Sequence, residues 1–313
     1  MEALTTEIEQ VREGRAAAPR KARSWRRRGL LASAVLAGVV ALGWLGLRMP
    51  PGSPAAPAAG SADRGTVAVP QDLPAPVLRF VAAVSAGSTP PDAPAPQTTP
   101  LYETAIQQGH GTMKLGPLSL PFRVTIASRL GEERHSDMEL TWFGLGVVSG
   151  VDDYIGKRGR TQMAGRDLAE AGDYLNQGAY LAMKAEQIGF PSSWILDPKV
   201  RWEPGADDHH ARLVLTRERL DGTTAEEYFD AGFDPANGFL MTLDTMRHRS
   251  EDSGKRPWHV DLGDWRNLAG PGERPLYGAG TIEVTWMDQG EPWLEQTAER
   301  IVTNVPVDEQ LVW

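Results

Sequence analysis

Large apolar side chains occupy every second position in the run Phe122-Arg123-Val124-Thr125-Ile126-Ala127. Successive side chains of a β-strand point to opposite faces of a sheet, so Phe122, Val124 and Ile126 would share one face. Aromatic and β-branched residues also fit a pleated, half-buried surface. The run therefore predicts a strand with one buried face.

Similar runs follow, separated by short turn sequences. Asp221-Gly222, Asn237-Gly238 and Gln289-Gly290 are residue pairs typical of tight turns. Strands joined by such short turns pair in antiparallel order, so the sequence predicts an antiparallel sheet of meander type. The other expected strand regions are Leu140–Val148, Ala211–Thr216, Glu226–Phe233, Phe239–Arg249, Trp258–Trp265, Thr281–Met287 and Ala298–Val305.

One helix is expected among these strands, over residues 167–188. Asp167 and Glu170 have the spacing of a capping box, and Gly189 with Pro191 would end the helix. Its apolar positions are mostly alanine, which lets a helix approach a sheet closely, so we place it on the concave face of a curved sheet. An ordinary surface helix is the alternative. The predicted fold class is α+β, with one main helix packed against a strongly curved antiparallel sheet. A half-barrel is the most curved form that we consider for this sheet.

An uncharged apolar run extends from Gly29 to Leu47, directly after Arg26, Arg27 and Arg28. A helix of this length spans roughly 28 Å, close to the ~30 Å hydrocarbon core of a bilayer. Basic residues stay on the cytoplasmic side, so we predict a single-pass protein of a bacterial cell membrane. Residues 1–28 would form a cytoplasmic tail and 29–48 a transmembrane helix. A cleaved signal peptide is the alternative, because small residues follow at 54–59.

Proline, alanine and glycine dominate residues 49–72, a composition that favours extended backbone and predicts a linker. Residues 73–313 would then form one extracytoplasmic α+β domain. A short helix at Pro76–Ala86 is expected to open it, with Pro76 in the first turn, where a missing N–H costs little. A second proline-rich stretch, Pro90–Pro100, follows this helix.

Charge is segregated along the chain. The whole chain carries a formal charge of −9, of which residues 1–48 contribute +5 and residues 49–313 contribute −14. An acidic outer domain has no general basic field, so binding to nucleic acid is not expected. The chain has no cysteine, which excludes disulfides, thiolate metal ligands and cysteine nucleophiles. No cofactor is predicted.

Several short motifs occur in order along the chain. They are Leu73-Pro74-Ala75-Pro76-Val77-Leu78-Arg79-Phe80, Asn176-Gln177-Gly178-Ala179-Tyr180, Phe190-Pro191-Ser192-Ser193-Trp194, Arg201-Trp202, the pair Arg247 and Arg249, and Trp258-His259-Val260-Asp261. Together they resemble an uncharacterised, membrane-anchored bacterial family of the domain-of-unknown-function kind, over roughly residues 73–305. The resemblance implies one coherent domain and carries no activity with it.

Three clusters contain side chains that catalysis or metal binding uses. Asp152 and Asp153, with Glu186 or Glu203, offer paired carboxylates for acid–base chemistry. His248 and His259 would face each other across a hairpin, but no Gly-x-Ser-x-Gly motif accompanies them. Residues 207–210 read Asp-Asp-His-His, yet neighbouring residues of a strand point apart, so an exposed turn is expected there. We predict no catalytic residue and no metal site.

Tryptophans are the remaining signal, because they supply large apolar surfaces that line binding clefts as well as fill cores. Trp194 and Trp202 flank the helix exit, and with Phe190 and Trp142 they are the expected ligand-lining residues. The leading hypothesis is a membrane-tethered, extracytoplasmic binding or carrier module for a hydrophobic or amphipathic, lipid-like ligand. The alternatives are an envelope scaffold or regulatory interaction protein, and a cofactor-independent hydrolase that uses carboxylates or histidine. The sequence identifies no protein partner.

Overall fold

The computed structural model describes residues 20–52, 54, 61–87 and 94–312, and it divides into two compact units, Met1–Arg48 and Met49–Trp313. In the first unit, helix α2 covers Arg20–Arg48 and includes the apolar run that the sequence marks. Within the described residues, no helix combines the length and apolarity that a membrane crossing requires. Of the expected cytoplasmic tail, residues 1–28, the first nineteen residues lie outside the described residues.

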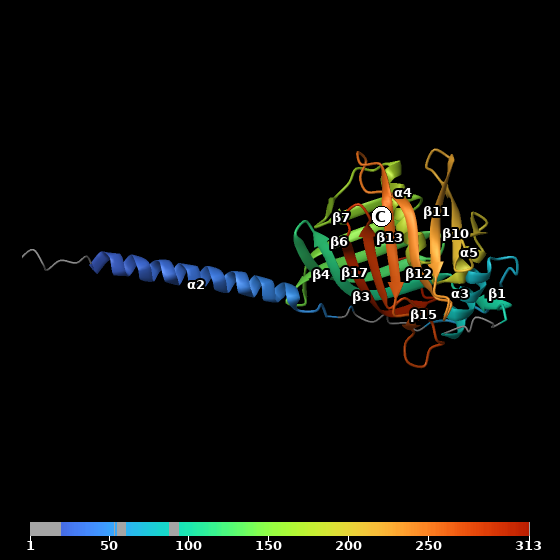
Figure 1. Ribbon diagram of the computed structural model, residues 1–313, viewed down its shortest axis with the longest axis horizontal. Helices are drawn as coiled ribbons and strands as arrows, with labels where there is room; N and C mark the ends of the chain where they lie inside the picture. The colour runs from blue at the N-terminus through green and yellow to red at the C-terminus, as the bar shows by residue number, and fades with distance from the viewer. Residues whose placement is uncertain (1–19, 53, 55–60, 88–93, 313) are drawn as a thin grey trace, which may run out of the picture. The chain divides into compact units, whose positions relative to one another are not determined.

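The second unit is built on one antiparallel sheet of thirteen strands, with few helices, as predicted (Figure 1). Its strand order is β8-β7-β6-β5-β4-β3-β17-β16-β13-β12-β11-β10-β9. The first arm comprises β3 (Thr104–Leu115), β4 (Leu118–Arg129), β5 (Glu133–Trp142), β6 (Leu145–Ile155), β7 (Arg158–Met163) and β8 (Arg166–Asp167). The second arm comprises β9 (Val200–Pro204), β10 (His210–Glu218), β11 (Thr224–Phe233), β12 (Leu240–His248), β13 (Lys255–Gly263), β16 (Thr281–Trp286) and β17 (Pro292–Thr303).

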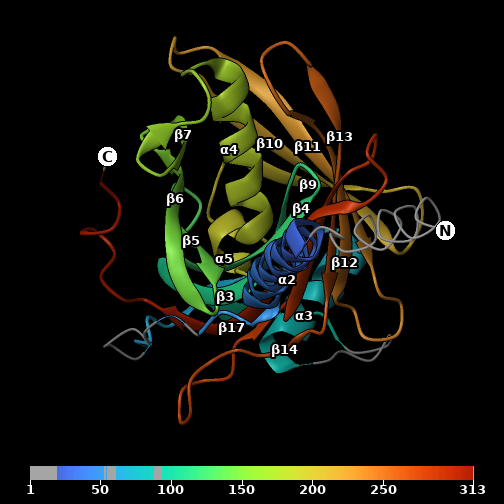
Figure 2. The same cartoon turned by 90° about the vertical axis from the view of Figure 1, so that its left-hand side faces the viewer.

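Two arms of the sheet meet the same helix, α4 (Asp173–Glu186), which contacts β6 and β7 as well as β12. Seven strands separate β7 from β12 in the sheet. At a strand spacing of about 4.8 Å, a flat sheet would hold β7 and β12 roughly 38 Å apart, whereas a helix is only about 10–12 Å wide. The sheet must therefore bend around α4, as Figure 2 shows. It does not close into a barrel, because β8 and β9 remain separate edges among the described strands.

Two adjacent amide side chains attach α4 to both arms. Asn176 Oδ1 accepts a hydrogen bond from the backbone N–H of Gly159 in β7, at 2.8 Å. Gln177 Nε2 donates to the carbonyl of Met246 in β12 at 3.0 Å, and its Oε1 accepts from the N–H of His248 at 3.0 Å. Both amides are buried, so these polar contacts are shielded from water.

Close approach of helix and sheet depends on small residues. A Cβ added at Gly159 would lie 2.7 Å from the carbonyl oxygen of Leu175 and 2.8 Å from the Cβ of Ala179. Such contacts are not tolerated, so only glycine permits the observed distance between β7 and α4. The prediction that small residues bring the helix against the sheet is thus consistent with this packing, and the surface-helix alternative is not, because ten residues of α4 are buried.

The start of α4 differs from the prediction. Asp167 lies in β8, and the helix begins at Asp173, after Gly172, with no side-chain cap. Arg217 instead donates two hydrogen bonds to the Asp173 carboxylate, at 2.7 and 2.9 Å. A carboxylate in the first turn also complements the helix dipole. The capping-box spacing was therefore misleading, because a tertiary ion pair fixes this end.

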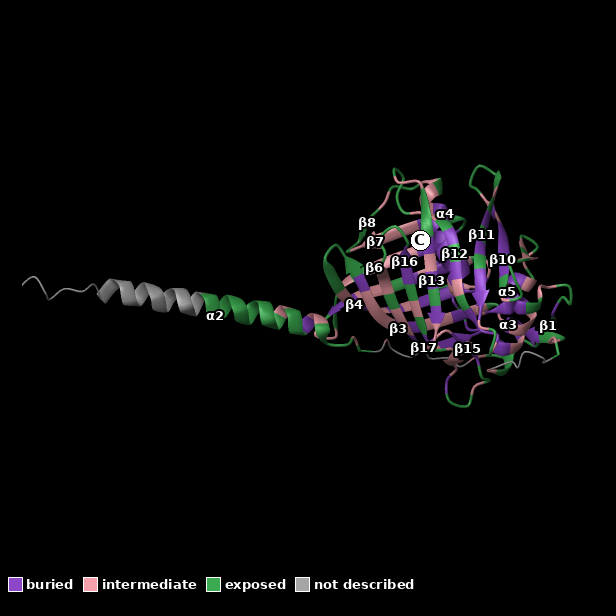
Figure 3. Ribbon diagram, viewed as in Figure 1, coloured by how far each residue is buried: buried purple, intermediate pink, exposed green. Residues whose placement is uncertain are grey.

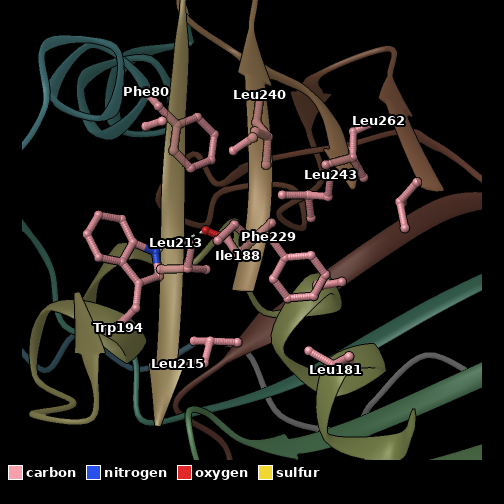
Figure 4. Close-up of a cluster of buried hydrophobic side chains, with 14 of the residues drawn as sticks. Phe80, Leu181, Ile188, Trp194, Leu213, Leu215, Phe229, Leu240, Leu243 and Leu262 are labelled. Carbon is pink, nitrogen blue, oxygen red and sulfur yellow. Dashed lines mark hydrogen bonds between the residues drawn. The ribbon is translucent and has the colours of Figure 1, made fainter. Parts of the chain in front are cut away.

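The main core fills the space between α4, the second arm and helix α3 (Ala75–Ala86), with large apolar side chains from all three (Figure 4). Alternate residues of β10 to β13 are buried, as the banding in Figure 3 shows. Phe80 of α3 contacts Phe233 and Trp265, with ring centroids 5.8 and 5.6 Å apart. The expected opening helix is confirmed, and Pro76 lies in its first turn.

Short elements complete the unit. Residues 66–68 of the expected linker form β1 (Thr66–Ala68), which pairs with β2 (Thr98–Pro100) at the end of the second proline-rich stretch. Linker residues 53 and 55–60, together with residues 88–93, lie outside the described residues. Helix α5 (Pro191–Ile195) begins at the proline expected to stop α4, and β14 (Arg266–Asn267) pairs with β15 (Tyr277–Gly278).

We expect Gln177→Ala to lower the free energy of unfolding by about 2–4 kcal/mol, because it removes the hydrogen bonds of a buried amide to two backbone groups of β12 and to the buried carboxylate of Glu227. Urea titration of the full-length protein, followed by tryptophan fluorescence, measures the change. Gln289→Ala, at an exposed turn, is the matched control and should change it by less than about 0.5 kcal/mol. Equal effects of the two substitutions would contradict the role given to Gln177.

Candidate functional site

A cavity of about 300 Å³ lies on the concave side of the sheet, beside α4. Side chains from both arms and from the helix line it, so the bend of the sheet creates it. Most of its wall is apolar. The apolar lining residues include Met113, Val124, Ile126, Met138, Met163, Ala182, Ala185, Trp258, Val260, Leu262, Ile282, Val284, Trp293 and Leu294.

Strand alternation explains this wall. Val124 and Ile126 belong to the run that predicts β4, and both are buried on the concave face with Phe122. Val260 and Leu262 follow the same period in β13. Two leucines at the rim, Leu115 and Leu168, are 39% and 59% exposed, so the apolar wall reaches the surface there.

A charged cluster around Arg134 forms one part of the cavity wall. Arg134 of β5 is 5% exposed and donates hydrogen bonds from Nη1 to Asp152 Oδ2 at 2.7 Å and from Nη2 to Glu186 Oε1 at 2.8 Å. Its Nε donates to the second oxygen of Glu186, and Thr161 Oγ1 donates to Asp152 Oδ1 at 2.7 Å. Every oxygen of the two carboxylates therefore accepts at least one hydrogen bond.

The two carboxylates respond differently to this environment. Burial acts to raise the pKa of Asp152, but the charge of Arg134 and the hydrogen bonds from Thr161 and Arg134 outweigh it, so this pKa is lowered. At Glu186 burial dominates over the attraction of Arg134, and the pKa is raised. The expected pairing of Asp152 with Glu186 is thus present, but through a shared arginine. Asp153 points elsewhere and binds Arg160, and Glu203 is on β9.

Arg247 of β12 is the second guanidinium of the wall, and it is not paired in this way. Its Nε is buried and has no hydrogen-bond partner among the described residues. Burial lowers the pKa of Arg247 to about 10, and the nearby charge of Arg134 adds to this effect, while Asp152 and Glu186 act to raise the pKa. The side chain therefore keeps its charge at neutral pH. The guanidinium carbon lies 4.9 Å from the Trp258 ring centroid and 5.7 Å from that of Trp286. These rings hold the cation by cation–π attraction.

Helix α4 leaves room for this arginine because residue 178 is glycine. A Cβ at Gly178 would lie 3.3 Å from Arg247 Nε, a tight contact. Further hydrogen-bond donors of the wall lack partners as well, since the indole N–H groups of Trp258 and Trp293 are buried and bind no described acceptor. The Ser136 hydroxyl is in the same state.

A second cavity, of about 920 Å³, is lined by apolar, polar and charged side chains from the ends of β4, β5 and β10 and from α4 and α5. Its cations are already paired. Lys184 Nζ donates to Asp197 at 2.9 Å and to the carbonyl of Gly131 at 3.0 Å, while Lys157 and Lys199 both bind Glu218. Burial lowers the pKa of Lys184, with Asp197 opposing it. The contacts here are those of a structural ion-pair network, so the concave cavity is the better candidate site.

The four ligand-lining residues expected from sequence lie elsewhere. Trp194 and Trp202 pack against each other with ring centroids 5.6 Å apart, and Trp194 belongs to the main core. Phe190 packs edge-on against Tyr102. Trp142 is 44% exposed at the end of β5. None of them is among the residues that line either cavity, and their contact with a ligand stays a prediction.

Sequence reasoning missed the tryptophans that do line the concave cavity, Trp258 and Trp293. Alternation in β13 places Trp258 beside Val260 on the buried face, and that was the available signal. Arg247 was noted only as part of an Arg-x-Arg motif. The sequence around Arg247 does not show that its side chain faces the cavity, because this depends on how β12 packs against α4.

The histidine pairing was wrong. His248 lies opposite Lys255 in the β12–β13 register, and His259 lies opposite Asp244. The His259 ring nitrogens contact Asp244 at 2.7 Å and Asp261 at 3.1 Å. Burial acts to lower the pKa of His259, but the hydrogen bonds to the two carboxylates outweigh it, so this pKa is raised. At residues 207–210, His210 contacts Asp207 at 2.7 Å on the surface. The described residues contain no group of three or more His, Asp or Glu side chains arranged to hold a metal ion.

Fold and site together define an α+β protein in which an open antiparallel sheet bends around one helix and encloses an apolar cavity with an unpaired arginine. The sequence model of the family of unknown function DUF6544 matches residues 66–296. The chain belongs to this family. The family match agrees with the resemblance to an uncharacterised family, and it does not test the individual motifs or the membrane anchor. No curated protein matches the sequence.

Among solved structures, the chain is similar to a LolA superfamily protein from Nitrosomonas europaea, with 10% identity, a TM-score of 0.41, and coverage of 77% of this chain and 98% of that one. It is also similar to a DUF1329 family protein from Desulfovibrio piger, with 10% identity, a TM-score of 0.38, and coverage of 66% and 88%. At these scores the similarities carry no argument about function.

The two arginines of the wall should differ in their effect on stability. We expect Arg134→Met to lower the free energy of unfolding by about 2–4 kcal/mol, because it leaves the half-buried carboxylates of Asp152 and Glu186 without their shared partner. Arg247→Met removes a cation that has no such partner and should change stability by less than about 1 kcal/mol. Urea titration of both variants tests this, and an equally large loss for Arg247→Met would refute the distinction.

Proposed function

We propose that this protein is a membrane-tethered, extracytoplasmic binding or carrier module, and that a hydrophobic or amphipathic ligand occupies the concave cavity. The observation that carries the proposal is an apolar cavity of about 300 Å³ between the sheet and α4. Its volume lies at the lower end of the range of small-molecule sites. It would hold one alkyl chain of moderate length rather than a complete two-chain lipid.

The energetics favour an apolar occupant. Each CH₂ group moved from water into such a wall contributes about 0.8 kcal/mol. A cavity lined by Val124, Ile126 and Leu262 also forgoes dispersion contacts, which an alkyl chain would restore. Catalysis has less support, because Arg134 and Thr161 engage the oxygens of Asp152 and Glu186. Both carboxylates are therefore engaged in the hydrogen-bond network around Arg134.

An exposed apolar edge accompanies the cavity. The turns of the β3–β4 and β5–β6 hairpins display large apolar side chains with exposed fractions from 39% to 71%; they are Leu115, Leu118, Trp142, Leu145 and Val147. Leu115 also lines the cavity, so the edge and the cavity are continuous. Groups of exposed apolar residues mark contacts with membranes or partner proteins. In our proposal this edge meets the membrane surface, and the ligand passes between membrane and cavity along it.

The tether in this proposal is the apolar run Gly29–Leu47, and the three arginines before it keep the N-terminus in the cytoplasm. Residues 49–313 would then lie outside the membrane. Gly52, near the start of the second unit, donates to the carbonyl of Gly144 in the β5–β6 turn at 3.4 Å. The chain thus enters this unit at the exposed apolar edge, which supports the orientation proposed.

Occupancy can be tested with a photoreactive alkyl diazirine that bears a neutral alcohol, added to the full-length protein in phosphatidylcholine nanodiscs. We expect crosslinks, mapped by peptide mass spectrometry, in β4, β13 and β17. Ala182→Leu fills part of the cavity and should reduce these crosslinks at least fivefold.

Ala236→Leu, at an exposed turn, adds the same side chain away from the cavity and should leave the crosslinks unchanged. Crosslinks confined to the hairpin edge, equal in all variants, would instead identify a scaffold surface and refute the carrier proposal.

Topology can be tested with two reporters fused after Trp313 in separate bacterial strains. Alkaline phosphatase, which is active only outside the cytoplasm, should be active, and a cytoplasm-dependent fluorescent protein should be dark. The fusion should stay in the membrane fraction after an alkaline wash. Replacing Val39 and Val40 with Arg should abolish all three results, whereas replacing them with Leu should not. A fluorescent fusion in the soluble fraction would show that the tether proposal is wrong.

A further inference from the structure

Hydrogen-bond donors and acceptors are unevenly satisfied in the cavity wall. The carboxylate oxygens of Asp152 and Glu186 all accept hydrogen bonds from Arg134 or Thr161. The groups of the wall without partners are donors or hydroxyls: Arg247 Nε, Trp258 Nε1, Trp293 Nε1 and Ser136 Oγ. A buried donor without an acceptor is costly, so this wall is complementary to a ligand that brings acceptors.

The charge of Arg247 further specifies which ligand the cavity wall would bind. Arg134 is held by two carboxylates, whereas no described group forms an ion pair with Arg247. Trp258 and Trp286 support the guanidinium by their ring faces, and a guanidinium so held keeps its N–H edges available. Guanidinium edges match carboxylate and phosphate oxygens in geometry and charge.

The apolar part of the wall adds the second requirement. Arg247 lies on β12 next to β13, whose Val260 and Leu262 continue the wall from Trp258. A ligand whose acceptors contact Arg247 would place any attached chain along these residues. An anion without a chain would leave that wall unfilled, and a chain without an anion would leave the donors unpaired.

We propose that the cavity binds a single-chain anionic amphiphile, with its carboxylate or phosphate on Arg247 and its alkyl chain against the apolar wall. This inference rests on the proposed function and specifies its ligand class. In it, Trp258 and Trp293 donate their indole N–H groups to the head group or to the atoms next to it. Arg247 is the residue that selects for charge.

The experiment compares photoreactive decyl probes that share one diazirine-bearing chain and differ in head group: carboxylate, phosphate, alcohol and trimethylammonium. Each is titrated into the full-length protein in phosphatidylcholine nanodiscs, and crosslinks to β13 and β17 are counted. The carboxylate or the phosphate probe should half-saturate at a concentration at least tenfold lower than the alcohol, and the ammonium probe should be weakest. Whichever of the two anions is preferred identifies the head group.

Arg247→Met should remove the preference for anions, so that the carboxylate, phosphate and alcohol probes half-saturate within about twofold of one another. The matched control is Arg249→Met, two residues along the chain, where the arginine is exposed and contacts Asp288 at 3.3 Å. It should keep the full preference. Unchanged urea midpoints for both variants confirm that each one folds.

The possible outcomes separate the two proposals. Equal crosslinking by all four probes, or an anion preference that survives Arg247→Met, overturns the anionic ligand and leaves the binding of apolar chains intact. Absence of cavity crosslinks with every probe overturns both. An anion preference lost equally in Arg249→Met would show a general surface-charge effect and would also overturn the assignment to Arg247.

Discussion

Attachment of one helix to two distant strands is the constraint on which this structure depends. Asn176 and Gln177 are adjacent in α4, yet they bind backbone groups of β7 and β12, which stand far apart in the order of the sheet. A flat sheet cannot satisfy both amides. Buried polar groups without partners are costly, so both amides must keep their hydrogen bonds to the backbone. They can do so only if the sheet is curved. The concave cavity is the space that this curvature leaves beside the helix.

The cavity wall combines one satisfied arginine with one unsatisfied arginine. Arg134 joins β5, β6 and α4 through two carboxylates and so stabilises the bend. Arg247 contributes no comparable bond, although burial opposes its charge. A half-buried charge that does not stabilise the fold is typical of residues kept for binding, since natural sites accept a loss of stability for function. The contrast between two arginines in one wall is what directs attention to the ligand.

Local patterns predicted most of the sheet correctly. Alternation at Phe122–Ala127 and the Asp-Gly and Asn-Gly turns depend on near neighbours, and β4, β10, β11, β12, β13 and β16 appear where they were expected. The Leu140–Val148 stretch holds the ends of two strands, because Phe143 and Gly144 take left-handed backbone and make a turn. The helix start was misplaced by six residues for a different reason: Arg217 determines it, and that residue is distant in sequence.

The candidate site was less predictable than the fold. Tryptophan content suggested a ligand cleft, but the four chosen residues pack in the core or at the surface, and Trp258 and Trp293 line the cavity instead. Asp152 and Glu186 were named as a carboxylate pair, and the structure joins them through an arginine that no spacing rule connects to them. Such a pairing can be predicted only when the relative positions of three separate elements are known, here β5, β6 and α4.

The sequence by itself determined the antiparallel strands, their turns, the opening helix and the apolar run near the N-terminus, because each follows from side-chain periodicity or backbone preference over a few residues. Tertiary structure alone decided that the sheet bends around α4, that an apolar cavity remains there, and that Arg247 faces it unpaired. These features arise from contacts between residues far apart in the chain. Periodicity assigns a side chain to a face of its own strand, but which strands and helices meet across that face is settled only when the whole unit packs.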